Sequence, residues 1–282
     1  MPAVWELVLT VLAGVGAGIL SAMFGVGGAV VTTPAIRVLG ATPLEAVGST
    51  IPSIIPSAAV GAWRYQREGL VRWDVVWRTI PVGVVVAVLG GPLSHAIPGR
   101  GHIQMIATAA LMAFTAYRMA VGARRPAVTA VALEAVQPEA APVLEAPVEL
   151  VEPAGDARTS WTLYGSIGAV AGALSGILGV GGGVILVPAF TELGRLPFKV
   201  ATATSLVCVG MFGAVSMVSH TFAGDINWWY ALALTVGVIP GARLGTTIAL
   251  RVTSYSLQVG FAWLLGVLAV LYGATETVLL TR

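Results

Sequence analysis

The chain has 282 residues, of which 57% are hydrophobic and only 10% charged, and its formal net charge is +2. Soluble domains carry about 25% charged residues, so this composition excludes a soluble globular enzyme, and we expect no nucleic-acid partner. Apolar runs of about 20 residues, the length of a membrane-spanning helix, cover most of the sequence. The composition therefore predicts an all-α polytopic membrane protein whose surroundings are the lipid bilayer.

Apolar segments follow one another in the same order in two halves of the chain. In the first half they lie at about 4–24, 29–40, 45–63, 75–97 and 103–121. In the second half they lie at about 161–178, 183–193, 200–222, 227–250 and 255–273. The second segment of each half is too short for the hydrocarbon core of about 30 Å, because a helix rises about 1.5 Å per residue. Each half is thus predicted to hold a broken or re-entrant helix pair followed by three spanning helices.

The two halves are related by an internal repeat. A shift of 154 residues aligns residues 14–35 with 168–189, and 12 of the 22 positions are identical. The same shift pairs Thr50 with Thr204, and beyond them the match continues after a one-residue change of register. Such self-similarity predicts two copies of one structural unit.

A segment of different composition separates the repeats. Residues 124–160 are rich in Pro, Ala, Val and Glu. Spaced prolines prevent a continuous helix, and the acidic side chains keep the segment out of the bilayer. We therefore predict a flexible cytoplasmic linker between a first membrane repeat, 1–123, and a second, 161–282. A segment that docks a partner or regulates the protein is the alternative.

The basic residues predict how the chain is oriented. If the loop at 64–74 is cytoplasmic, 11 basic residues lie inside and 3 outside, in agreement with the positive-inside rule. The corresponding loop of the second half, HTFAGDINW, has no Lys or Arg. Equivalent loops of opposite bias belong on opposite faces, so the repeats are predicted to be inverted. Both termini then lie outside, in a multi-pass protein of the cell (inner) membrane.

Each repeat carries a GVGG cluster inside an apolar run, in SAMFGVGGAVVTTPA and in SGILGVGGGVILVPA. Isolated glycines such as Gly18, Gly172 and Gly241 are typical of close helix packing, but consecutive glycines weaken a helix more than packing requires. We therefore predict a helix break at each cluster. The N–H groups that start the next helix attract anions, and inverted repeats with matching breaks are typical of secondary transporters. The predicted anion-binding residues here are Gly27, Gly28, Ala29, Gly181, Gly182 and Gly183.

Hydroxyl residues follow each short segment. They either cap or brace helices or contact the ligand, and the sequence leaves both interpretations open. The candidates are Ser49, Thr50, Thr204 and Ser205. Pro52 and Pro56 are predicted to kink or unwind the third segment.

Arg243 is the one charged residue that falls within a predicted span. Charges in a span are costly and usually functional, so Arg243 is a candidate for holding an anionic substrate; the alternative is that it snorkels to the membrane edge. His220 ends its span near the predicted outer face, which favours an interfacial role over proton transfer.

The sequence predicts neither a metal site nor a cofactor. No Cys/His cluster with metal-ligand spacing occurs, and Glu45, Asp74 and Asp225 lie at segment ends rather than deep in a span. A carboxylate proton relay is therefore not visible. Coupling of transport to a proton or sodium gradient stays open.

The duplicated motif resembles the TauE/SafE sulfite-exporter family. The family pattern G-x-G-x-L/I-S-x-x-x-G-V-G-G-G-x-x-x-x-P is matched by GAGILSAMFGVGGAVVTTP and by VAGALSGILGVGGGVILVP, and the similarity covers both halves. Ala29 replaces the last glycine of the first cluster, and the acidic linker is long. The resemblance implies an inner-membrane permease for sulfite, sulfonates or related organic anions.

These observations predict a secondary transporter for a small anionic substrate bound near the midplane at the two helix breaks, and the family resemblance implies that it is an exporter. The alternatives are an anion channel on the same scaffold and a non-transporting membrane assembly or sensor protein. A homodimer is compatible with such a glycine-rich bundle.

Overall fold

The computed structural model describes residues 4–96, 102–123, 157–179 and 181–280, which are almost entirely helical and contain no strand. The first half forms α1 (Val4–Phe24), α2 (Ala29–Val38), α3 (Pro43–Arg67), α4 (Trp73–Ala96) and α5 (His102–Ala123). The second half forms α7 (Ala157–Leu178), α8 (Gly183–Glu192), α9 (Phe198–Ala223), α10 (Trp228–Arg251) and α11 (Ser254–Leu280). The helices match the predicted segments closely. Residues 157–160, which we placed in the linker, begin α7; the rest of the predicted linker, 124–156, lies outside the described residues.

Seven helices in the described ranges are long and apolar enough to cross a membrane: α1, α4, α5, α7, α9, α10 and α11. This confirms the class of protein. α3 is as long as these helices but less apolar, and its Ser49, Thr50, Ser53 and Ser57 are buried in the protein. Protein rather than lipid therefore surrounds much of α3. The helix runs through Pro52 and Pro56 without interruption, so the prolines do not unwind it, and the alternative, a kink, stays a prediction.

The glycine stripes hold the long helices together in pairs. An added Cβ on Gly18 of α1 would lie 2.5 Å from the carbonyl oxygen of Val238 in α10, and one on Gly241 would lie 2.2 Å from that of Val15. A Cβ on Gly172 of α7 would lie 2.1 Å from the carbonyl oxygen of Gly83 in α4. The backbones approach so closely only because these side chains are absent, which confirms the predicted packing role.

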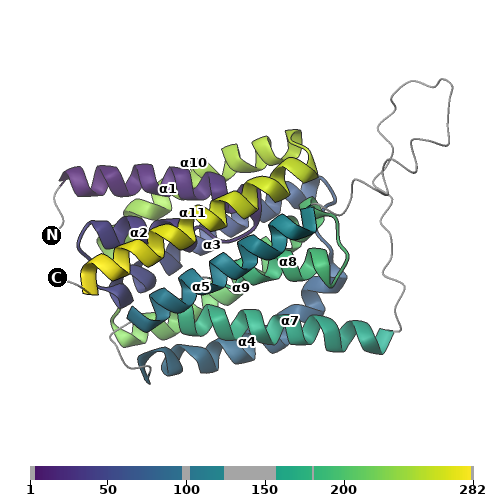
Figure 1. The fold of residues 1–282 in the computed structure, drawn as a ribbon, viewed down its shortest axis with the longest axis horizontal. Coiled ribbons are helices and arrows are strands. Elements are labelled where there is room, and N and C mark those ends of the chain that lie inside the picture. The colour runs from purple at the N-terminus through teal and green to yellow at the C-terminus, as the bar shows by residue number, and fades with distance from the viewer. Residues whose placement is uncertain (1–3, 97–101, 124–156, 180, 281–282) are drawn as a thin grey trace.

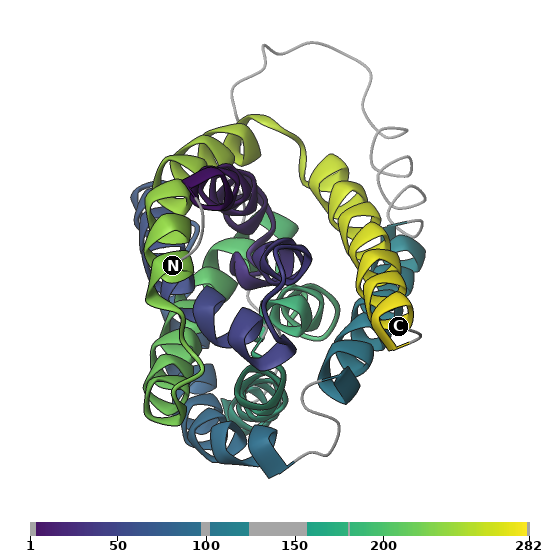
Figure 2. The same ribbon diagram turned by 90° about the vertical axis from the view of Figure 1, so that its left-hand side faces the viewer.

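Each helix pair joins one helix of the first half to one helix of the second half. The first helix of each half packs on the fourth helix of the other, α1 on α10 and α7 on α4, while α3 packs on α9 and α5 on α11. Figure 2 shows the α5–α11 pair side by side at one edge of the bundle. The start of α1 and the end of α11 lie at one end of the molecule, and α5 ends and α7 begins at the other (Figure 1). How the two halves face a membrane stays a prediction.

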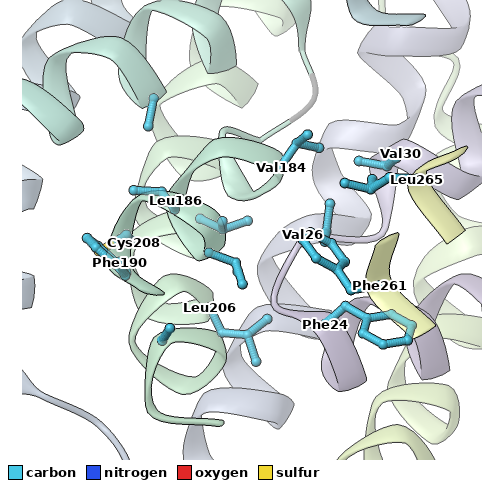
Figure 3. Packing of buried hydrophobic residues seen from close by; sticks show 14 of the residues in the cluster. Phe24, Val26, Val30, Val184, Leu186, Phe190, Leu206, Cys208, Phe261 and Leu265 are labelled. Carbon is cyan, nitrogen blue, oxygen red and sulfur yellow. The ribbon is translucent and has the colours of Figure 1, made fainter. Parts of the chain in front are cut away.

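The core lies where the two short helices meet, and Figure 3 shows its packing. Its side chains come mainly from the described helices other than α10, and the part labelled there comes from the end of α1, the start of α2, α8, α9 and α11. The labelled members are Phe24, Val26, Val30, Val184, Leu186, Phe190, Leu206, Cys208, Phe261 and Leu265. The centre of the molecule is thus built around the two glycine clusters.

Candidate functional site

Both predicted helix breaks are present. The first break, residues 25–28, separates α1 from α2, and the second, residues 179–182, separates α7 from α8. Gly25 and Gly27 have φ angles of 72° and 77° in the first break, and Gly179 and Gly181 have 67° and 79° in the second. Residues with a side chain rarely adopt this left-handed conformation. The glycines therefore allow the chain to reverse direction in the interior, as the sequence predicted.

The two breaks meet in the centre of the molecule. An added Cβ on Gly183 would lie 2.6 Å from both the carbonyl oxygen of Gly25 and the Cα of Val26. A Cβ on Gly181 would lie 3.8 Å from the carbonyl oxygen of Val26. Backbone from one half thus lies directly against backbone from the other. Of the predicted residues, Gly181 and Gly183 lie against the first break, whereas the nearest atoms to a Cβ on Gly28 and on Gly182 belong to Ala17 and Ala171.

The polar groups at the two breaks include the backbone N–H groups at the starts of α2 and α8. Gly28 and Gly182 are the N-cap residues, and neither helix start has a side-chain cap. The first N–H groups of a helix have no partner within it, and they carry the positive end of the helix dipole. Two such ends beside each other attract an anion without a charged side chain.

Apolar side chains close the site in this structure. A Cβ on Gly27 would lie 2.6 Å from Cγ1 of Val209, and the nearest atoms to a Cβ on Gly181 belong to Val209 and Ile54. Ile54 and Val209 are fully buried. An anion can reach the helix starts only after these side chains and the glycines have moved apart.

Two of the predicted hydroxyls brace the opposite half instead of facing the breaks. Ser49 of α3 accepts a hydrogen bond of 2.8 Å from the backbone N–H of Asn227, before α10. Thr204 of α9 accepts one of 3.2 Å from the backbone N–H of Arg72, before α4, and donates its own proton to Val200. In each contact a hydroxyl of one half accepts a hydrogen bond from the backbone of the other half, so the two contacts are equivalent. They favour the bracing interpretation for Ser49 and Thr204.

These equivalent contacts and the helix starts correct the register of the repeat. α2 begins at Ala29 and α8 at Gly183, 154 residues later, whereas α3 begins at Pro43 and α9 at Phe198, 155 residues later. The extra residue lies in the turn between the short helix and the next helix of the second half. Ser49 is therefore the counterpart of Thr204, and Thr50 is the counterpart of Ser205. The pairing of Thr50 with Thr204 was wrong by one residue.

The other two hydroxyls lie nearer to the breaks. Ser205 donates a hydrogen bond of 2.8 Å to the carbonyl oxygen of Gly25, inside the first break. Thr50 donates to the carbonyl oxygen of Val47 in its own helix and lies 3.3 Å from the hydroxyl of Thr33 in α2. Of the four hydroxyls, Ser205 is the one that touches a break directly.

Arg243 and His220 differ in their surroundings: one is exposed and the other is enclosed by protein. Arg243 is exposed on the outer face of α10, so the structure does not bring it to the breaks, and its position fits the snorkelling alternative. His220 is buried, with 2% of its surface exposed, and its Nδ1 lies 3.0 Å from Oδ2 of Asp225. The expected interfacial position of His220 was wrong, because the loop after α9 folds back over the imidazole.

A small cavity lined by both polar and apolar side chains lies next to the second break, and sequence reasoning missed it. It has about 10 Å³ for the centre of a water-sized particle, enough for about one water molecule. Its polar lining residues come from helices far apart in the sequence: Thr33, Gln104, Thr108, His220 and Tyr272. The one signal in the sequence was Gln104 and Thr108, two polar residues one helical turn apart in an otherwise apolar span.

Known families and proteins that resemble this chain are membrane transporters. The model of the family described as Sulfite exporter TauE/SafE matches residues 10–272. A "Probable membrane transporter protein" of Xylella fastidiosa is 27% identical over 251 residues, which cover 88% of this chain and 87% of that protein. The "Probable membrane transporter protein YunE" of Bacillus subtilis is 27% identical over 86% of this chain and 88% of its own length. No solved structure matches the chain.

Proposed function

Because the chain belongs to the TauE/SafE sulfite-exporter family, whose relatives here are named as probable membrane transporters, we propose that it is a secondary transporter of a small anion. The substrate class that suits the site is a small oxyanion such as sulfite, a sulfonate or a related organic acid. The direction we propose is export, with both termini outside and the linker in the cytoplasm.

The observation that carries this proposal is the contact between the two breaks. Gly183, the first residue of α8, lies against Gly25 and Val26 of the first break, which leads to the start of α2, and neither helix start has a side-chain cap. Lipid cannot satisfy such N–H groups, and each helix start favours a negative ligand. Anion binding at Gly27, Gly28, Ala29 and Gly181–Gly183 follows from this arrangement.

The closed packing supports a carrier rather than an open pore. Val26, Ile54 and Val209 fill the space at the breaks and are at most 3% exposed. Passage of an anion therefore requires a conformational change at every transport cycle, which is the behaviour of a carrier. Saturable flux is the expected kinetic result, whereas conductance far above carrier turnover would indicate the channel.

The test places a carboxylate at the start of α2. Gly28 has a φ of −53°, and the nearest atom to an added Cβ is 3.8 Å away, in Ala17, so Gly28→Asp fits the fold. An N-cap Asp accepts hydrogen bonds from the first N–H groups and so competes with the substrate. Flux of a sulfur oxyanion into proteoliposomes should fall about tenfold or more, equivalent to about 1.4 kcal/mol of lost binding.

Gly28→Asn is the matched control, because it caps the helix equally well without the negative charge. We expect the Asn variant to transport faster than the Asp variant. Melting temperatures of the purified variants verify that both are folded. A folded Asp variant that transports like the unaltered protein would contradict the assignment of the site.

A further inference from the structure

The cavity beside the second break has the properties of a cation site. Five polar side chains line it, each 5% exposed or less, and they come from α2, α5, α9 and α11: Thr33, Gln104, Thr108, His220 and Tyr272. Polar groups in the interior of a membrane protein are costly and usually functional. The question is which ligand these particular atoms prefer.

Two of the hydroxyls have already donated their protons away from the cavity. Thr108 donates a hydrogen bond of 2.8 Å to the backbone carbonyl oxygen of Gln104. Tyr272 donates one of 3.1 Å to the backbone carbonyl oxygen of Val30. A hydroxyl has one proton and two lone pairs, so the remaining capacity of both groups is that of an acceptor.

The third hydroxyl, that of Thr33, also uses its proton in a hydrogen bond within the protein. Thr33 lies 3.3 Å from the hydroxyl of Thr50, and Thr50 uses its own proton in a hydrogen bond of 2.8 Å to Val47. Thr33 therefore has its one proton for either Thr50 or Tyr272, with which it also shares a side-chain hydrogen bond. Its lone pairs, like those of Thr108 and Tyr272, are what it offers to a ligand. These three hydroxyl oxygens, as acceptors, favour a cation over an anion.

The C-terminal end of α7 also favours a cation in the cavity. Ile177 and Leu178 line the cavity, and α7 ends at Leu178. The last carbonyl groups of a helix lack partners within it, and they carry the negative end of its dipole. In secondary transporters such helix ends, together with irregular backbone, coordinate sodium ions. The size of the cavity, about one water molecule, also fits a sodium ion, which is smaller than water.

We propose that this cavity is a sodium site and that sodium is the coupling ion of transport. The second break joins the negative end of α7 to the positive start of α8 across residues 179–182. A sodium ion at the first and an anion at the second attract each other, so each raises the affinity for the other. The coupling rests on the proposed function, whereas the sodium site itself does not.

The binding test needs no substrate. The purified full chain is melted in sodium, potassium and choline chloride at equal ionic strength, because a ligand that binds the folded state raises its stability. We expect stabilisation specific to sodium. Thr108→Val removes one oxygen and keeps the shape, and the sodium concentration for half of the effect should rise about tenfold, which corresponds to the loss of one good hydrogen-bonding ligand.

Thr79→Val is the matched control. Thr79 of α4 is buried and donates to the carbonyl four residues earlier, as Thr108 does, but it does not line the cavity. Its sodium response should equal that of the unaltered protein. If Thr108→Val does not fold, Tyr272→Phe removes another cavity oxygen and keeps the ring. Equal melting temperatures in the three salts, or an unchanged half-effect concentration in the folded cavity variants, would overturn the site.

Flux separates the two proposals. Anion flux in proteoliposomes should depend on a sodium gradient, and Thr108→Val should shift the sodium concentration for half-maximal flux about tenfold, in parallel with binding. Anion flux that ignores sodium would refute the coupling and leave the proposed function standing. Sodium-specific stabilisation without flux of any small oxyanion would support the cation site and refute the anion carrier.

Discussion

The first and second breaks have the same sequence, Gly-Val-Gly-Gly, yet their surroundings differ. At the first break, Ser205 binds the carbonyl of Gly25, and the Phe24 ring packs against Phe261 with 5.7 Å between the centroids. At the second break, Leu178 stands at the position of Phe24, and the polar cavity lies beside it. Aromatic packing thus fills the space at one break, and polar side chains surround a small cavity at the other.

The difference extends to other equivalent positions. In the corrected register, Thr33 of the cavity corresponds to Val187, and His220 corresponds to Tyr65, whose hydroxyl donates to the carbonyl of Ala22. Exchange of Thr for Val removes a ligand oxygen while the backbone stays the same. The duplicated scaffold thus has two similar helix starts, whereas the cavity with polar side chains from both halves lies beside the second break.

The largest expected effect tests whether the scaffold itself is equivalent in the two halves. Gly18→Ala and Gly172→Ala add a Cβ that would lie 2.5 Å and 2.1 Å from backbone oxygens of α10 and α4. Overpacking of this kind costs about 1–3 kcal/mol, occasionally more. We expect both variants to melt at clearly lower temperatures than the unaltered protein.

The control for the packing test lies in the same helix. A Cβ on Gly16 would meet nothing within 4 Å, so Gly16→Ala should be neutral or stabilising by up to about 1 kcal/mol. A loss of stability in only one of the two packing variants would show that the helix pairs are not equivalent. The comparison would then concern the whole scaffold rather than the linings of the breaks.

A smaller effect is expected from the hydroxyls at equivalent positions, Ser205 and Thr50. Ser205→Ala leaves the carbonyl of Gly25 without a donor that comes from the other half of the chain, which should cost about 1–2 kcal/mol. Thr50→Val removes a bond within its own helix and the longer contact of 3.3 Å with Thr33 of the same half, and it should cost less because Thr33 also has Tyr272 as a partner. Chemical denaturation of the purified variants measures both, and equal costs would contradict the unequal roles of these residues.

The two breaks could be predicted from the sequence, whereas the residues that surround them could not. Consecutive glycines determine where a helix ends, because the preference for positive φ is local, and apolar length determines the spans. The bracing contacts of Ser49 and Thr204 depend on partners more than 130 residues away. The one-residue change of register lies in a turn, where sequence matches are weakest. The polar cavity could not be predicted, because its lining comes from helices that only the tertiary fold brings together.

The position of Arg243 could have been predicted. Gly237, Gly241 and Gly245 form the face of α10 that packs on α1. Residues two apart in a helix differ by about 200° around its axis, since one turn takes about 3.6 residues. Arg243 lies two residues from both Gly241 and Gly245, so the glycine stripe itself turns Arg243 away from the packed face. The charge suggested function, whereas the helix periodicity indicated an outward position.

The smallest effect on stability, and the sharpest test of the first break, is expected from Thr202. It is the counterpart of Val47, and its backbone lies against Gly25. Its hydroxyl is buried, and within the described part of the chain it has no hydrogen-bond partner. A buried hydroxyl without a partner destabilises the folded state, so Thr202→Val should keep or raise the melting temperature, by the equivalent of about 1 kcal/mol at most.

Transport should respond differently from stability. If the Thr202 hydroxyl donates to an anion that enters at the first break, Thr202→Val removes one hydrogen bond, and flux at low substrate concentration should fall about fivefold to tenfold, since about 1 kcal/mol is lost. Its sodium response should stay unchanged, because Thr202 does not line the cavity. Unaltered flux would show that the anion does not use this hydroxyl. A changed sodium response would show that Thr202 affects the cavity without lining it, and that the anion and sodium sites are not separate.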